Sequence, residues 1–211
     1  MNALIVLIHI PKTGGTSLRV AAERYFGAGA MLYDYGTEAR LTSDLVREWV
    51  YEREDLAGFA TAAAEQRFRF LSGHFPLDKY VETFPDAHFV SWIRQPAARI
   101  WSAYRHFVRD NGYQGTFREF YSMGRFQNQQ SRLLQRHRHR LEFVGITERF
   151  APSLARFNRQ FGVRLRQHAA NRSPGDDLHE PSTLDLQELE MLNADDIKLY
   201  RSFERLLLDP V

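Results

Sequence analysis

The chain has 211 residues, of which 44% are hydrophobic and 26% are charged, and its formal net charge is +2. These proportions exclude a disordered or fibrous protein, and the small net charge argues against a dedicated nucleic-acid-binding protein. The absence of cysteine excludes disulfides, thiolate metal sites and cysteine nucleophiles, and it favours a reducing compartment, the cytoplasm. We expect a single domain over residues 1–211, near the upper end of the usual length for one domain.

The chain begins with an apolar run over residues 3–9. Such a continuous run is typical of a strand in a parallel sheet that is covered on both faces. It is too short to cross a bilayer and lacks a basic segment before it, so we expect no transmembrane segment and no signal peptide. Turn residues over 11–15 end the strand, and residues 16–26 have helical apolar spacing with hydroxyl residues at the start.

The middle of the chain predicts further alternation of helices and strands. Residues 41–66 have helical spacing, with an interruption at Gly58 and an apolar stripe of Leu41, Leu45, Trp49 and Leu56. Residues 68–74 alternate as in a strand and end in Gly-His, before a proline that opens a short helix. A strand over residues 87–93 follows, and it leads through a loop into a long amphipathic helix.

The remaining segments continue the pattern. We expect helices over residues 116–140, a strand over 142–146, a helix over 148–161, a loop over 171–177 and one or two closing helices over 184–208. Strands that alternate with helices predict an α/β fold with a central parallel sheet flanked by helices.

The loop after the first strand has the features of a phosphate site. Its sequence is HIPKTGGTS over residues 9–17. Unpaired amides at a helix N-terminus carry partial positive charge, and glycines let the backbone approach an anion closely. Lys12 adds a full positive charge. The order differs from a Walker A loop because Lys12 precedes Gly14 and Gly15 instead of following the glycines.

A second motif follows the strand over residues 87–93. Arg94 lies directly after this strand, and Ser102 lies two helical turns further on. Ligands bind at the carboxyl ends of strands in open α/β sheets, and an arginine can make a bidentate contact with a phosphate. We therefore predict that Arg94 and Ser102 hold a second phosphate.

The PKTGGTS sequence of residues 11–17 and the R-x-P-x-x-R-x-x-S-x-Y pattern of residues 94–104 together resemble the motifs of sulfotransferases that use 3′-phosphoadenosine 5′-phosphosulfate (PAPS). The resemblance implies a P-loop-like sulfotransferase fold, PAPS as co-substrate, PAP as product and no metal. It implies that the 5′-phosphosulfate is held by Pro11, Lys12, Thr13, Gly14, Gly15, Thr16 and Ser17, and the 3′-phosphate by Arg94 and Ser102.

Three further segments, residues 70–76, 128–134 and 143–150, resemble the carbohydrate branch of this family, which includes the glycosaminoglycan 2-O-sulfotransferases. Residues 193–200 give a weaker match. The resemblance implies a hydroxyl-bearing acceptor, expected to be a saccharide, with Gln129 and Arg132 on the acceptor side and Arg172 near the nucleotide. The small size and the lack of cysteine differ from the eukaryotic enzymes and favour a compact bacterial-type member.

Sulfuryl transfer requires stabilisation of the leaving phosphate and a base for the acceptor hydroxyl. Lys12 suits the first task, and His74, which follows a predicted strand and matches the catalytic histidine of the family, is the expected base. His9 lies at the edge of an apolar strand, so we expect it to have a packed or hydrogen-bonded structural role instead.

Three alternatives stay open from the residues alone. A P-loop-type small-molecule kinase would share the fold, but the displaced lysine and the lack of an aspartate at a strand end weigh against it. A non-catalytic nucleotide- or glycan-binding module would not need both Lys12 and His74. A nucleic-acid-binding protein could use the basic run over residues 132–140, although such runs are usually solvated surface.

Overall fold

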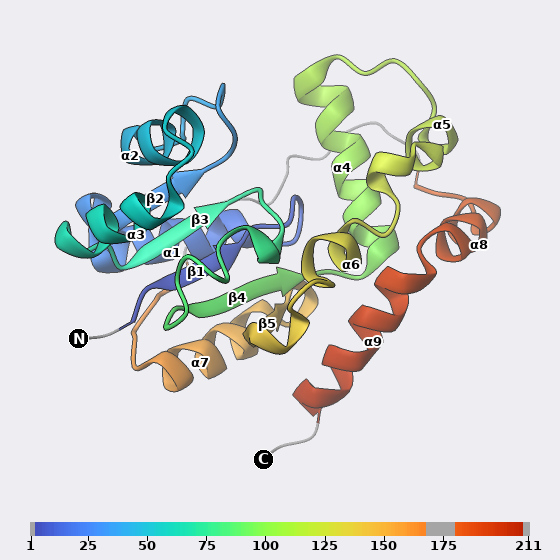
Figure 1. Cartoon of the computed structure of the whole chain (residues 1–211). Helices are drawn as coiled ribbons and strands as arrows, with labels where there is room; N and C mark the ends of the chain where they lie inside the picture. The colour runs from blue at the N-terminus through green and yellow to red at the C-terminus, as the bar shows by residue number, and fades with distance from the viewer. Residues whose placement is uncertain (1–2, 168–179, 209–211) are drawn as a thin grey trace.

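The computed structural model describes residues 3–167 and 180–208. In this part of the chain, a five-stranded sheet has the order β2-β3-β1-β4-β5, and each pair of neighbouring strands is parallel (Figure 1). The strands are β1 (Ile5–Ile8), β2 (Met31–Asp34), β3 (Phe70–Gly73), β4 (His88–Ile93) and β5 (Leu141–Ile146). The predicted α/β fold with a central parallel sheet is therefore confirmed.

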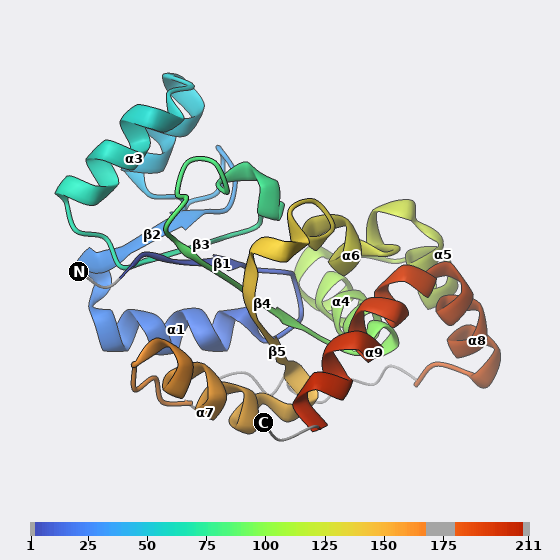
Figure 2. The ribbon, with the colours of Figure 1, turned by 60° about the horizontal axis from the view of Figure 1, so that its bottom comes forward.

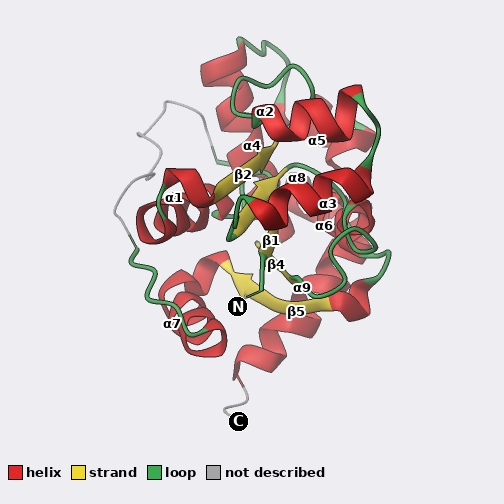
Figure 3. Cartoon of the chain, turned by 60° about the vertical axis from the view of Figure 1, so that its left-hand side comes forward, coloured by secondary structure: helices red, strands yellow, loops and turns green. Residues whose placement is uncertain are grey.

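Helices connect the strands and cover the sheet, which forms a central layer in Figure 3. They are α1 (Gly15–Phe26), α2 (Asp44–Val46), α3 (Leu56–Glu65), α4 (Pro96–Asn111), α5 (Phe117–Ser122), α6 (Gln129–Leu134), α7 (Phe150–Phe161), α8 (Thr183–Leu192) and α9 (Ala194–Leu208). A π-helical segment spans Arg47–Glu52, and single 3-10 turns span Ala28–Ala30, Leu77–Lys79, Gly124–Phe126, Arg138–Arg140 and Thr147–Arg149.

Two hydrophobic clusters lie on the two faces of the sheet. Val6 and Ile8 of β1 belong to the cluster that includes residues of α3, whereas Ile5 and Leu7 belong to the one that includes residues of α1 and α7. In Figure 2, α1 and α7 lie below the strands and α3 lies above them. Because successive side chains of a strand point to opposite faces, a strand covered on both sides is apolar at every position. This explains the continuous apolar run at the start of the chain.

A third hydrophobic cluster joins α4, α5 and α8 beyond the carboxyl ends of the strands. Figure 1 shows these helices on the side of the molecule toward which β4 points. Within residues 3–167 and 180–208, no helix is both long and apolar enough to cross a membrane.

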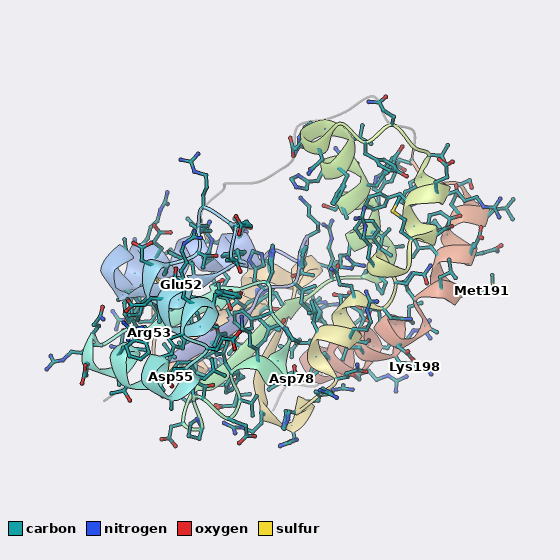
Figure 4. All side chains as sticks on the ribbon, turned by 45° about the horizontal axis from the view of Figure 1, so that its top comes forward. Glu52, Arg53, Asp55, Asp78, Met191 and Lys198 are labelled. Atoms are coloured by element: carbon teal, nitrogen blue, oxygen red, sulfur yellow. The ribbon has the colours of Figure 1, made fainter. Side chains whose placement is uncertain are left out.

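The predicted helix over residues 41–66 is wrong in its details. The structure has two helical pieces, and the break lies around Arg53 and Asp55, labelled in Figure 4, not at Gly58. Asp55 accepts a hydrogen bond from the N–H of Gly58 at 2.8 Å and so caps α3. Gly58 is needed for packing, because a Cβ there would lie 2.1 Å from Trp49 Cζ3. Of the predicted apolar stripe, Leu45 and Trp49 pack against the core, whereas Leu41 and Leu56 are exposed.

The sequence analysis also missed β2. This strand has only four residues, and its acidic end, Asp34, gives no continuous apolar run. Asp34 is nevertheless 1% exposed, because side chains from other elements meet it. The omission matters for function, since the chain after β2 forms part of the candidate site.

Candidate functional site

The loop between β1 and α1 is a tight turn that ends in a helix N-terminus. Gly14 is the N-cap of α1 and has a left-handed backbone with φ 84°, and Lys12 has φ 68°. The Thr13 hydroxyl is buried and donates to the Ile10 carbonyl at 2.8 Å. Because the first amides of a helix have no partner within the helix, they remain available to an anion, and the first turn of α1 has no acidic residue to repel one.

Gly15 allows the ring of His9 to pack against this turn. A Cβ on Gly15 would lie 2.1 Å from His9 Cδ2, so no larger residue fits here without movement. His9 is 6% exposed, and its Nδ1 lies 2.8 Å from the Tyr35 hydroxyl, which in turn lies 3.2 Å from the Ser72 hydroxyl. The predicted packed and hydrogen-bonded role of His9 is confirmed.

His74 follows β3 and lies beside His9. The ring centroids of the two histidines are 4.9 Å apart, and those of Tyr35 and His74 are 4.6 Å apart. Burial lowers the pKa of His74 from its ordinary value of 6.5 to about 4, while the negative charge of Asp34 acts in the opposite direction. The burial is partial, because the residue as a whole is still exposed to solvent. A neutral, accessible imidazole at neutral pH is able to accept a proton.

Asp34 anchors the backbone of His74 and is itself held by a buried cluster. Its carbonyl accepts a 2.9 Å hydrogen bond from the N–H of His74. Its carboxylate accepts hydrogen bonds from Tyr51 at 2.6 Å, Lys79 at 2.6 Å and Tyr80 at 2.7 Å. Burial alone would raise the pKa of Asp34, but these donors lower it below its ordinary value. The cluster therefore keeps Asp34 charged, and this charge acts on the pKa of His74.

A cavity of about 470 Å³ opens between this turn and α4. Five of the residues predicted to form the site line it, namely Pro11, Lys12, Thr16, His74 and Gln129. The structure thus brings the loop lysine and the histidine after β3 to one cavity. Of the other predicted loop residues, Thr13 and Gly15 are buried, Gly14 and Ser17 are half-buried, and the four are not among the lining residues.

Arg94 lies between β4 and α4, contacts the loop between β1 and α1, and is not among the residues that line the cavity. Its Nη1 donates to the Lys12 carbonyl at 3.3 Å, and its Nε lies 3.8 Å from Glu148 Oε1. Burial lowers the pKa of Arg94 below its ordinary value, and the charge of Glu148 acts in the opposite direction. Ser102 is half-buried on the following helix, α4, and is not among the residues that line the cavity.

The two predicted acceptor-side residues differ in position. Gln129 lines the cavity, and its Oε1 accepts a hydrogen bond from Arg99 Nη1 at 2.7 Å. Arg132 is exposed, donates to the Arg125 carbonyl at 2.8 Å and is not among the lining residues. Arg172 lies outside the described residues.

Nine of the lining residues were not predicted as site residues, among them Arg19, Tyr35 and Arg99. Arg99 is fully buried and donates to Gln129 and, through Nη2, to the Phe126 carbonyl at 2.6 Å. Burial lowers the pKa of Arg99 to about 10, which leaves it charged at neutral pH. Its place within the R-x-P-x-x-R pattern was a usable signal, whereas Tyr35 follows the strand that the sequence analysis missed.

Several cations surround the cavity. Burial lowers the pKa of Lys12, the charges of Arg109 and Arg94 lower it further, and the charge of Asp110 acts in the opposite direction. Arg19 and Arg99 line the same cavity, and the lining residues include no aspartate or glutamate. Cations that repel one another in a partly dry site favour the binding of an anion, which relieves the repulsion. The cavity is therefore chemically suited to a phosphate- or sulfate-bearing ligand.

The chain is similar to known proteins in its structure and not in its sequence. No protein-family model and no curated protein matches the sequence. A sulfotransferase from Alicyclobacillus acidocaldarius is similar over 100% of this chain and 98% of its own, with a TM-score of 0.57 and 18% identity. Mouse sulfotransferase SULT7A1, solved with PAP, is similar over 79% of this chain and 61% of its own, with a TM-score of 0.52 and 14% identity. The chain therefore has the fold of these sulfotransferases.

Proposed function

We propose that this protein transfers a sulfuryl group from PAPS to a hydroxyl group of an acceptor. The observation that carries the proposal is the meeting of Lys12 and His74 at one cavity beside the N-terminus of α1. The Lys12 ammonium can stabilise the charge on a leaving phosphate, and the His74 imidazole can accept the proton of an acceptor hydroxyl. A module that only binds a nucleotide needs no accessible imidazole at this point.

The donor has two phosphate groups. The cavity and the start of α1 suit the first, and Arg94 and Ser102, which do not line the cavity, are proposed for the second. Lys12 and the amides at the start of α1 would hold the 5′-phosphosulfate, with the loop from Pro11 to Ser17 wrapped around it. Arg94, joined to the loop at the Lys12 carbonyl, would hold the 3′-phosphate, with Ser102 as a further donor. PAPS supplies an activated sulfuryl group, so the protein has to orient it, stabilise the developing charge and provide a base for the acceptor hydroxyl.

The transfer is an in-line displacement at sulfur. The acceptor oxygen forms a bond to sulfur while the bond from sulfur to the bridging phosphate oxygen breaks. The hydroxyl proton passes to the neutral ring of His74, and the negative charge that develops on the phosphate oxygen is stabilised by Lys12 and the loop amides. The products are the sulfated acceptor and PAP.

We propose a saccharide as the acceptor, with Gln129 as a contact. Its amide lies in the cavity and is oriented by Arg99, so it offers a fixed hydrogen-bonding group of the kind that recognises a sugar hydroxyl. Arg132 is exposed beyond the cavity, so it would meet only an acceptor that extends past the reacting sugar.

Calorimetric titration with PAP, compared with ATP plus Mg²⁺, tests the proposal. We expect PAP to bind without metal and its affinity to fall in Arg94→Ala. Lys198→Ala is a matched control, since this cation lies on α9 with its side chain 80% exposed. Binding of ATP with Mg²⁺ but not of PAP would support a kinase instead. If PAP binds, transfer of labelled sulfate to a panel of saccharides and simple alcohols then tests the acceptor class.

A further inference from the structure

The side chain of Gln130 holds both backbone polar groups of Arg94. Its Oε1 accepts a hydrogen bond from the Arg94 N–H at 2.8 Å, and its Nε2 donates to the Arg94 carbonyl at 2.9 Å. Gln130 is fully buried. Two bonds from one planar amide fix the peptide groups on both sides of Arg94, the point at which β4 gives way to α4.

Gln130 is in turn fixed by Asp196 of α9. The Asp196 carboxylate accepts hydrogen bonds from the backbone N–H of Gln130 at 3.2 Å, from its Nε2 at 3.4 Å and from the N–H of Ser131 at 2.7 Å. Asp196 is fully buried too. Burial of a carboxylate costs free energy unless hydrogen bonds satisfy it, so the fold keeps the donors of Gln130 and Ser131 against Asp196. Because one of these donors is the side-chain Nε2 of Gln130, the contact fixes the orientation of its amide.

Asn128, which precedes α6, also contacts the start of α9. Its Oδ1 accepts from the N–H groups of Asp195 at 3.0 Å and Asp196 at 3.1 Å, and its own N–H donates to Asn193 Oδ1 at 2.9 Å. The contacts link α6 to α9, which lie side by side in Figures 1 and 2. A continuous set of hydrogen bonds therefore runs from α9 to the backbone of Arg94.

The guanidinium of Arg94 is held much less firmly than its backbone. Its contact with the Lys12 carbonyl is 3.3 Å long and its distance to Glu148 is 3.8 Å. Its buried Nε has no hydrogen-bond partner among the described residues. The direction in which this side chain leaves the sheet is consequently set by its backbone.

We propose that Gln130 is a positioning residue that aims Arg94 at the 3′-phosphate of the donor, with Asp196 holding Gln130 in place. This inference rests on the proposed function. A purely structural Gln130 would affect the stability of the fold without affecting the discrimination between nucleotides. A positioning Gln130 affects the affinity for one phosphate group.

The test compares the affinities for PAP and AMP, which differ only in the 3′-phosphate, by calorimetry. In Gln130→Met, which has a side chain of similar length without hydrogen bonds to Arg94, we expect the preference for PAP over AMP to fall about tenfold. Gln127→Met is the matched control. Gln127 lies three residues before Gln130, and its side chain donates to the carbonyls of Tyr121 at 3.3 Å and Ser122 at 3.0 Å. Because these contacts do not involve Arg94, removing the Gln127 amide should leave the preference for PAP over AMP unchanged.

Two further variants make the result decisive. In an Arg94→Ala background, Gln130→Met should cause no further loss of preference, because the two residues act through one contact. Asp196→Asn, which keeps the shape of the side chain, should reduce the preference about threefold and serves if Gln130→Met does not fold. An unchanged preference in the folded variants, alongside its loss in Arg94→Ala, would overturn the positioning role. A wild type without preference for PAP would overturn the donor site itself.

Discussion

The backbone N–H of His74 donates a 2.9 Å hydrogen bond to the carbonyl of Asp34, so the end of β2 fixes the residue that follows β3. The pairing of β2 with β3 continues to Gly73, where a Cβ would lie 1.8 Å from the Asp34 carbonyl oxygen. This close approach of the two backbones fixes the position of His74, the next residue, at the cavity. The Asp34 carboxylate faces a buried cluster of hydrogen-bond donors, so one residue serves both packing and the site.

Replacement of Asp34 by Asn should lower the free energy of unfolding by about 1–3 kcal/mol, because the ammonium of Lys79 loses its charged partner and a buried donor loses its acceptor. Chemical denaturation at pH 7 measures this change. Asp78→Asn is the control, since Asp78 pairs at 3.1 Å with Arg136, whose side chain is 77% exposed, and should change the stability by less than about 1 kcal/mol. Equal losses in the two variants would contradict the role of the cluster.

Replacement of His74 by Ala should reduce the transfer rate at least about 100-fold, because the acceptor proton loses its base. The wild-type profile of kcat/KM against pH gives a second readout. Burial lowers the pKa of His74, so the fall of kcat/KM on the acid side of the profile (the acid limb) should have its midpoint below pH 6.5. At lower pH the ring of His74 is protonated and cannot act as a base. Unchanged transfer in the variant, or an acid limb above pH 6.5, would remove His74 as the base.

Replacement of Lys12 by Ala should reduce kcat about 100- to 1000-fold, because the charge that develops on the leaving phosphate loses a stabilising cation. Circular dichroism should show an intact fold, since the Lys12 side chain lies at the cavity and not in the hydrophobic clusters. The exposed Lys198, labelled in Figure 4, provides the Lys198→Ala control with unchanged kcat. A similar kcat for the Lys12 variant and the control would exclude this role.

His9 should make the stability depend on pH. Burial, followed by the charges of His74 and Arg19, lowers the pKa of His9 from 6.5 to about 3. The unfolded chain therefore takes up a proton that the folded protein does not, and stability is lost as the pH falls from about 6.5 towards 3, by up to about 1.4 kcal/mol per pH unit. Denaturation curves across this range measure the slope of the free energy of unfolding against pH. In His9→Asn this slope should fall by the amount that corresponds to about one bound proton, and an unchanged slope would show that other groups are responsible.

Local sequence patterns determined much of the fold and identified the loop that lines the cavity. β1, β3, β4 and β5 contain buried apolar residues on both faces, so each was recognisable without knowledge of its neighbours. The loop over residues 11–17 was predictable for a similar reason, because a phosphate-binding turn needs its glycines, its cation and its helix N-terminus to be contiguous in the chain.

Contacts between distant residues were decided only by the tertiary structure. The short β2 could not be recognised alone, yet it supplies Asp34, whose carbonyl holds the N–H of His74, and leads to Tyr35 beside His9. Gln130 looks like an ordinary polar residue of a helix until the fold buries it against Arg94, and the partner of Arg99, Gln129, was not apparent from the motif that contains Arg99. Burial gives these groups their effect, because a polar side chain removed from water must find its partners within the protein, and sequence spacing does not reveal partners that are far apart along the chain.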